Sequence, residues 1–224
     1  MLLSTVLVLA VSCVAVHSFK CCVPDQWEGV LGLTEGLVQN GQPAFVQGYV
    51  ALSYDYTNKR VAEYVNLTTQ GVPTLQKIII DYNKNVMYTI KEEAKYCRAV
   101  QPAPPLSRCV PDTARETSRF HLGAGNNSLK VIAYEIDVPD MQITAVTSMT
   151  AQDCLPVGEL MYGAANNVPF LASMGYVNIV PGIKDPSVFN VPSYCDKAEI
   201  NDVPGLETGN FITSYIHRRL GFFQ

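Results

Sequence analysis

Residues 49–67 read YVALSYDYTNKRVAEYVNL, and this stretch decides the fold class. Tyrosine, valine and leucine dominate the runs on either side of a polar centre, and apolar residues that recur at every second position are typical of β-strands. The centre, Thr57-Asn58-Lys59-Arg60, is rich in turn-forming residues. The stretch therefore predicts a β-hairpin.

The same pattern recurs along the chain. In residues 77–97, KIIIDYNKNVMYTIKEEAKYC, the turn Asn83-Lys84-Asn85 separates an isoleucine-rich run from a second apolar run. About eight or more strands joined by hairpins predict an all-β fold with little helix, built as an antiparallel sandwich or barrel. The further strand-like runs are Lys130 to Asp137, Ile143 to Met149, Gly158 to Tyr162 and Phe170 to Val180.

Helix signals are few. Residues 112–120, DTARETSRF, begin with the candidate N-cap Asp112 and predict about two helical turns. In the tail, residues 206–219 place apolar side chains on one helical face, although their Thr, Tyr, Ile and Phe content suits a strand almost as well. The proline-rich stretch 99–112 predicts an irregular surface connection, because proline cannot donate to an interior ladder.

The N-terminus predicts secretion. The first nineteen residues contain no Asp, Glu, Lys or Arg, and residues 1–18 are typical of a signal peptide cleaved after Ser18. An uncleaved membrane anchor is the alternative, but the apolar core is shorter than the roughly twenty residues a bilayer requires. Residues 19–224 then form a single extracellular domain with N-glycosylation sequons at Asn66 and Asn126.

Six of the seven cysteines lie after the signal. In an oxidising compartment three disulfides are expected, but the sequence alone does not rank the pairings. Zinc binding is the alternative, and the chain has neither a CxxC pair nor a histidine cluster for it. The six cysteines are Cys21, Cys22, Cys97, Cys109, Cys154 and Cys195.

Composition and motifs argue against several function classes. The net charge of −4 is mild and spread along the chain, so nucleic acid is not an expected partner. The only histidines after the signal are His121 and His217, and no nucleophile elbow, zinc-protease motif or phosphate loop is present. The motif GAGNNS at 123–128 is interpreted as a turn that carries a sequon. The chain is therefore predicted not to be an enzyme.

One stretch has the ligand spacing of an EF-hand calcium loop. The loop requires glycine at its sharp turn, where this chain has Val86, and both flanks look like strands, so a hairpin turn is the preferred interpretation. A calcium site made from other oxygen ligands stays open. The residues at the EF-hand spacing are Asp81, Asn83, Asn85, Met87, Thr89 and Glu92.

Several segments together resemble the ependymin and ependymin-related secreted glycoproteins. They are CCVPDQWEG at 21–29, ALSYD at 51–55, DCLPV at 153–157, GIKDPSVF at 182–189 and PSYC at 192–195. The resemblance implies two antiparallel sheets that form a half-open β-barrel around a hydrophobic pocket, similar to bacterial lipoprotein carriers. It favours a ligand cavity over the filled core that composition alone would favour.

The resemblance also implies cysteine pairs and partners. Cys21 would pair with Cys154 and Cys97 with Cys195, and Cys22 and Cys109, which are left over, are then inferred to pair with each other. It implies a homodimer and calcium binding, for which Asp185, in the proline-flanked stretch 181–195, is the candidate ligand. No other cofactor is expected.

The leading hypothesis is a secreted glycoprotein that binds a lipid, fatty acid or other hydrophobic ligand between its sheets. The alternative is a calcium-linked extracellular matrix or cell-adhesion protein that acts through its surface and glycans. A large cavity lined by Tyr, Phe, Ile and Met would favour the first hypothesis, and a solid core the second.

Overall fold

The computed structural model describes residues 21–39, 41–102, 108–138, 142–165, 167–198 and 200–201. The predicted signal peptide and the predicted tail element at 206–219 lie outside these residues. The strands are β1 (Gln26–Gln39), β2 (Gln42–Asp55), β3 (Arg60–Thr69), β4 (Val72–Asp81), β5 (Val86–Lys91), β6 (Tyr96–Val100), β7 (Arg115–Ala124), β8 (Asn127–Val138), β9 (Ile143–Thr150), β10 (Pro156–Ala165), β11 (Val168–Pro181) and β12 (Ile200–Asn201).

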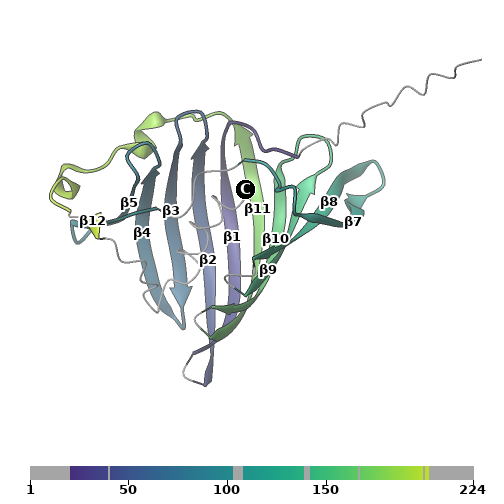
Figure 1. The fold of residues 1–224 in the computed structure, drawn as a ribbon, viewed down its shortest axis with the longest axis horizontal. Helices are drawn as coiled ribbons and strands as arrows, with labels where there is room; N and C mark the ends of the chain where they lie inside the picture. Colours follow the sequence, from purple (N-terminus) through teal and green to yellow (C-terminus); the bar gives the residue numbers. More distant parts are fainter. Residues whose placement is uncertain are drawn as a thin grey trace, which may run out of the picture.

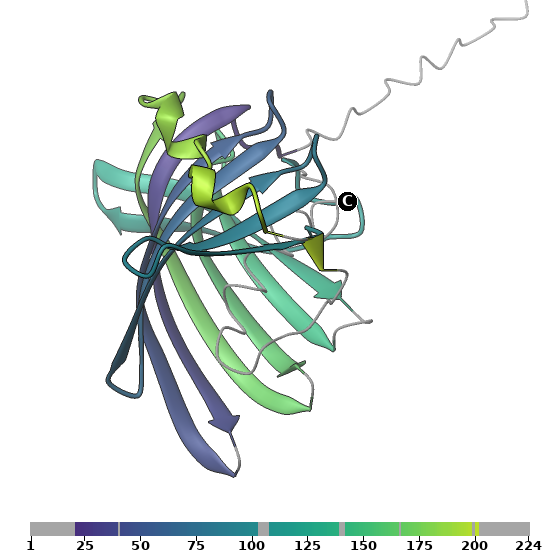
Figure 2. The same ribbon diagram turned by 90° about the vertical axis from the view of Figure 1, so that its left-hand side faces the viewer.

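The twelve strands of the described residues belong to one sheet, in the order β12-β6-β5-β4-β3-β2-β1-β11-β10-β9-β8-β7. Neighbouring strands are antiparallel except β12 and β6, which pair in parallel. The long strands lie side by side from β5 to β9, and the sheet curves without closing on itself (Figures 1 and 2). The predicted all-β, antiparallel, open architecture is confirmed, with the two expected sheets joined through β1 and β11.

Hairpin turns set the register of this sheet, as predicted for the first two. The turn at 56–59 joins β2 to β3 with Lys59 at a φ of 52°, and the turn at 82–85 joins β4 to β5 with Asn85 at 53°. Left-handed backbone of this kind matches the right-handed twist of the flanking strands. The residues at the EF-hand spacing thus lie on a β-hairpin, although this says nothing about a calcium site elsewhere.

The predicted helix at 112–120 is wrong. Arg115–Ala124 forms β7, which pairs with β8 along its length. All ten β7 residues are exposed, so this segment buries no side chain against the core, and nine residues are too few to hold a helix without packing. The hairpin turn that follows depends on Gly123, at a φ of 92°, where an added Cβ would lie 2.2 Å from the Asn127 carbonyl oxygen.

Strand β1 was not among the predicted strands, although it lies at the centre of the sheet between β2 and β11. Its segment, QWEGVLGLTEGLVQ, contains three glycines, which weaken a strand prediction. The register places Gly32 of β1 opposite Gly175 of β11, and Gly175 opposite Gly158 of β10. These glycines leave bare backbone on one face of three adjacent strands.

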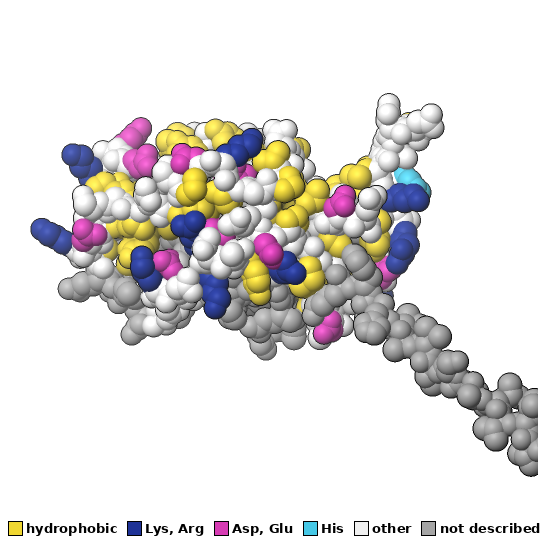
Figure 3. Space-filling model, turned by 90° about the horizontal axis from the view of Figure 1, so that it is seen from above, with side chains coloured by type: hydrophobic (Ala, Val, Ile, Leu, Met, Phe, Trp, Pro, Cys, Tyr) yellow, Lys and Arg dark blue, Asp and Glu magenta, His cyan; other side chains and the backbone are white. Residues whose placement is uncertain are grey.

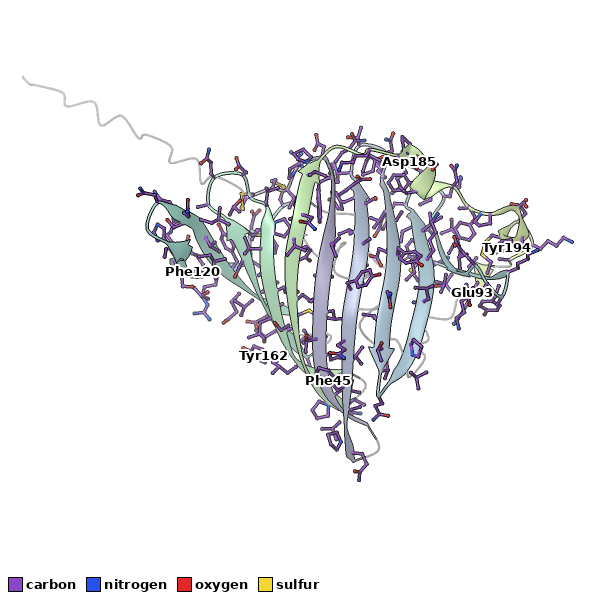
Figure 4. The ribbon with its side chains drawn as sticks, turned by 180° about the vertical axis from the view of Figure 1, so that it is seen from behind. Phe45, Glu93, Phe120, Tyr162, Asp185 and Tyr194 are labelled. Carbon is purple, nitrogen blue, oxygen red and sulfur yellow. A yellow bond between two sulfur atoms is a disulfide. The ribbon has the colours of Figure 1, made fainter. Side chains whose placement is uncertain are left out.

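After β11 the chain crosses over the outside of the sheet in two 3-10 turns, η2 (Pro186–Phe189) and η3 (Ser193–Cys195). Buried Cys195 packs with Ile79 of β4 and Ile90 of β5, and the half-buried Tyr194 joins this small cluster. Figure 4 shows Asp185 and Tyr194 along this crossing segment, beside the edge of the sheet that bears β5 and β6. The crossing segment gives β4 and β5 apolar cover on the outer face.

Candidate ligand-binding face

The two faces of the sheet differ sharply in burial. Along β1, Leu31, Leu33 and Glu35 are buried, whereas Thr34 and Gly36, on either side of Glu35, are exposed. Side chains alternate between faces along a strand, so the buried set marks one face, which we call the inner face. The opposite, outer face carries exposed aromatic residues such as Phe45 and Tyr162 (Figure 4).

The inner face is a continuous apolar surface across the central strands. Its members follow the register from strand to strand: Leu31 of β1 lies opposite Val50 of β2 and Tyr176 of β11. Met161 of β10 lies opposite Ala145 of β9. The buried apolar residues that β1, β2, β3 and β11 contribute include Leu31, Leu33, Val46, Val50, Leu52, Val65, Leu67, Phe170, Ala172 and Met174.

An aromatic group closes one end of the inner face. The Trp27 ring stacks on Tyr54 at 5.6 Å between centroids and meets Tyr176 edge-on at 6.4 Å. Burial raises the pKa of the Tyr176 hydroxyl, and the nearby Glu63 carboxylate raises it further. Burial, followed by the same carboxylate, also raises the pKa of Tyr82. Glu63 therefore lies among tyrosines at this end.

Polar side chains are sparse on the inner face, and the buried charged side chains there are acidic. Glu35 of β1 and Glu63 of β3 are each 1% exposed, and Glu159 of β10 is 9% exposed. Burial raises the pKa of Glu35 to about 8. Its Oε1 atom accepts no hydrogen bond from the described residues, whereas Glu63 and Glu159 each have an interaction. The sequence reasoning did not single out these three acids, although each falls on the apolar phase of its strand.

An ion-pair cluster lies on the outer face, at the end of β2. The buried Asp55 carboxylate accepts hydrogen bonds from Gln26 Nε2 (2.8 Å), Asn58 N (3.1 Å), Asn58 Nδ2 (2.8 Å) and Arg60 Nε (2.8 Å). Burial alone would raise the pKa of Asp55, but these hydrogen bonds outweigh it and hold the pKa below its usual value. The Arg60 guanidinium also lies 4.0 Å from the centre of the Phe189 ring. The cluster thus ties the crossing segment to the hairpin.

The disulfides join Cys21 to Cys154, Cys22 to Cys109 and Cys97 to Cys195, the same pairs that the resemblance implies. Cys97–Cys195 fixes the crossing segment to β6. The other two bridges hold the segment before β1 against the loop after β9 and the segment before β7. All three lie outside the inner face's centre and act as bracing.

Asp185, the candidate calcium ligand, is the N-cap of η2. Its side chain accepts hydrogen bonds from Ser187 N (2.9 Å) and Ser187 Oγ (2.8 Å), and these bonds hold the pKa of Asp185 below its usual value. The structure explains its place as a cap. Within the described ranges no three His, Cys, Asp or Glu side chains gather as a metal group.

The remaining predicted residues lie away from the inner face. Asn126 is exposed in the β7–β8 turn, and Asn66 of β3 is partly exposed, with its Nδ2 donating to the Tyr49 hydroxyl at 3.1 Å. His121 is exposed on β7. Figure 3 shows the face seen from above, where hydrophobic and charged side chains are interspersed. Glycosylation at the two asparagines stays a prediction.

A solved structure gives a weak comparison. A domain described as an outer membrane lipoprotein-sorting protein from Vibrio parahaemolyticus aligns with 72% of this chain and 88% of its own length. The TM-score is 0.33 and the sequence identity 6%, too low to support an argument about function. In the described part of the chain, none of the helical segments has the length and hydropathy of a bilayer-crossing helix.

Sequence comparisons are more informative. Mammalian ependymin-related protein 1 of Rattus norvegicus is 28% identical over 185 residues, covering 80% of this chain and 77% of that protein. Ependymin-related protein 1 of Haliotis asinina is 27% identical, covering 79% and 90%. Ependymin of Notemigonus crysoleucas is 23% identical, covering 87% and 88%. The Ependymin family model matches residues 72–195, more than half of the chain. The chain therefore belongs to the ependymin family.

Proposed function

We propose that this protein is a secreted, non-enzymatic carrier that holds the apolar part of a lipid, fatty acid or other hydrophobic ligand against the inner face of its sheet. The observation that carries the proposal is the inner face itself, a curved layer of buried apolar side chains that spans the central strands with few polar groups. Apolar concave surfaces with a small number of placed polar groups are typical of ligand sites. Members of the ependymin family are extracellular proteins, which supports secretion.

Uptake of an apolar probe tests the carrier proposal. The purified protein is titrated with a neutral fluorescent lipid probe, and native mass spectrometry with lipid extraction identifies material that co-purifies. Saturable uptake is expected, since burying each methylene of a ligand contributes about 0.8 kcal/mol. An empty protein that takes up no probe would contradict the proposal.

Adjacent residues of β11 supply a matched pair of variants. Ala172 is fully buried on the inner face, and Ser173 is exposed on the outer face. Ala172→Phe places a large ring opposite Glu35 on the inner face and is expected to weaken probe uptake at least tenfold, whereas Ser173→Phe should leave uptake unchanged. Circular dichroism and urea unfolding check that both variants fold, because overpacking commonly destabilises by about 1–3 kcal/mol.

We propose further that two copies pair through the outer face. Phe45, Gly36, Leu171 and Tyr162 lie in one register row across β2, β1, β11 and β10, and the three large side chains are each more than 40% exposed. Exposed apolar rows of this kind are typical of interaction surfaces. Leu171→Glu should convert a dimer to a monomer in light scattering without loss of folding. A wild-type monomer would contradict the pairing.

The calcium role of Asp185 stays a prediction from the family resemblance. Calorimetric titration with Ca²⁺, compared between wild type and Asp185→Asn, tests it. Calcium-dependent attachment to extracellular matrix without any probe uptake would instead favour the adhesion hypothesis. Loss of mass on enzymatic deglycosylation, compared between wild type and Asn66→Gln or Asn126→Gln, tests the two sequons.

A further inference from the structure

The inner face carries a polar group for the head of its ligand. We propose that Glu35 binds the ammonium group of an amine-bearing amphiphile, so that this carrier selects long-chain amines over long-chain carboxylates. The inference rests on the carrier function proposed above and deepens it by assigning the chemistry of the ligand's polar end.

The surroundings of Glu35 are apolar on every side given by the register. Leu33 and Leu37 flank it on β1, Val46 lies opposite on β2, and Ala172 lies opposite on β11. Glu35 is 1% exposed, and its Oε1 atom has no hydrogen-bond partner among the described residues. A buried polar atom without a partner destabilises the fold, so a ligand that supplies the missing donor gains affinity from it.

The distribution of charge distinguishes an amine from a carboxylate. The seven central strands, β4, β3, β2, β1, β11, β10 and β9, contain only two basic residues, Arg60 and Lys77. Both lie on the outer face: Arg60 binds Asp55 and covers Phe189, and Lys77 lies opposite the outer-cluster residue Ile90. The described inner face therefore offers a carboxylate no cation along these strands.

Other titratable groups on the inner face do not change this conclusion. Tyr54 of β2 and Tyr176 of β11 lie toward the Trp27 end, and Glu63 lies with Tyr176 there. Glu159 of β10 lies opposite Met174, two strands from β1, and is a second acidic side chain rather than a cation. Arg98 is on β6, next to the edge strand β12 and five strands from β1, and already has an interaction.

Ionisation of Glu35 gives the inference a pH signature. Burial raises its pKa to about 8 in the empty protein, so the carboxyl is largely protonated at neutral pH. An ammonium ion favours the charged carboxylate and lowers that pKa on binding. By linkage, the affinity for an ammonium ligand rises with pH up to about 8 and then levels off, while the amine itself stays charged to about pH 10.

Three probes with the same chain test the inference on the full protein. Dodecylamine, dodecanol and dodecanoate each displace a neutral fluorescent lipid probe, at concentrations below their micellar limits and at about pH 8. Dodecylamine is expected to bind about tenfold or more tightly than dodecanol, because a buried charge-assisted hydrogen bond is worth at least that factor. Dodecanoate is expected to bind more weakly than dodecanol.

Two variants on the same strand separate the role of Glu35 from general charge. Glu35→Gln keeps the shape of the side chain and should bring dodecylamine to within about threefold of dodecanol, with no rise in affinity with pH. Glu28→Gln, on the outer face of β1 beside Ser53, should keep the full preference. If Glu35→Gln does not fold, the order of affinities of the three probes for the wild type, and its change with pH, still test whether the protein prefers the amine.

The outcomes are distinguishable. Equal or tighter binding of dodecanoate, or an amine preference that survives Glu35→Gln, overturns the inference and leaves the carrier function standing. Failure of every probe, dodecanol included, overturns the carrier function and the inference with it.

Discussion

Asp55 is the best test of how the outer-face cluster supports the sheet. The proposed change is Asp55→Asn, which keeps the shape of the side chain and replaces one carboxylate oxygen by an amide NH₂. Oδ1 accepts from Gln26 Nε2 and Asn58 N, and Oδ2 accepts from Asn58 Nδ2 and Arg60 Nε. In either orientation the new NH₂ faces two donors, so two of the four hydrogen bonds are lost.

The expected loss follows from these contacts. Hydrogen bonds to a charged group contribute about 1.5–3 kcal/mol each, and the lower value applies because the Arg60 side chain is 30% exposed. Two such bonds give a loss of about 3 kcal/mol in the free energy of unfolding. Urea unfolding with the disulfides intact measures it as a lower midpoint at an unchanged m-value.

A neighbouring strand end supplies the control. Asp81 of β4 accepts from Asn83 N and Lys84 N through Oδ1 alone, and its Oδ2 meets Lys84 Nζ at 3.2 Å on the surface. An amide oxygen replaces Oδ1 without loss, so Asp81→Asn should change the free energy of unfolding by less than about 1 kcal/mol. Similar effects for both variants would refute the reasoning.

The pH dependence checks the same cluster independently. The folded-state pKa of Asp55 is depressed, so its stabilisation is fully present above the unfolded value of about 3.9 and is lost as the pH falls through the folded pKa. The stability difference between wild type and Asp55→Asn should therefore shrink below about pH 4. A difference that stays constant down to about pH 2 would show that the carboxylate charge is not involved.

Three further predictions follow from the same structure. Because burial raises the pKa of Glu35, the folded protein keeps a proton at neutral pH that the unfolded chain has lost. The stability of the wild type relative to Glu35→Gln, measured by urea unfolding, should therefore fall by about 3 kcal/mol between pH 4.5 and pH 7. A difference that does not depend on pH would contradict the apolar surroundings of Glu35. Replacing both Cys97 and Cys195 by serine opens a loop with a sequence separation of 98 and should lower the free energy of unfolding by up to about 4–5 kcal/mol. The crossing segment should then become the first site of proteolysis. Earlier cleavage at another site would count against its role as a brace. Phe189→Leu removes the ring beneath the Arg60 guanidinium and should lower the free energy of unfolding by about 1 kcal/mol. In a double-mutant cycle with Arg60→Lys, the two losses should not add, because both variants weaken the same contact. Additive losses would show that the two side chains do not interact.

The sequence by itself determined the fold class, the hairpins at 56–59 and 82–85 and the β character of β8 to β11. These features are local: the alternation of apolar residues and the turn-forming residues each depend on a few consecutive positions, and strands that are neighbours in sequence pair in the sheet. The family motifs added an open sheet and named the cysteine pairs that the structure contains. The local pattern at 112–120 wrongly predicted a helix, because the backbone of this segment forms hairpin hydrogen bonds with β8 instead.

The tertiary structure decided what no local pattern contained. Glycine-rich β1 is central because β2 and β11, far apart in sequence, both pair with it and supply the hydrogen bonds that its composition does not predict. The same pairing surrounds Glu35 with Val46 and Ala172 and separates it from the basic residues Arg60 and Lys77. A residue's face is set by strand parity, but its neighbours across the sheet are set by long-range register, and the chemistry of the inner face depends on those neighbours.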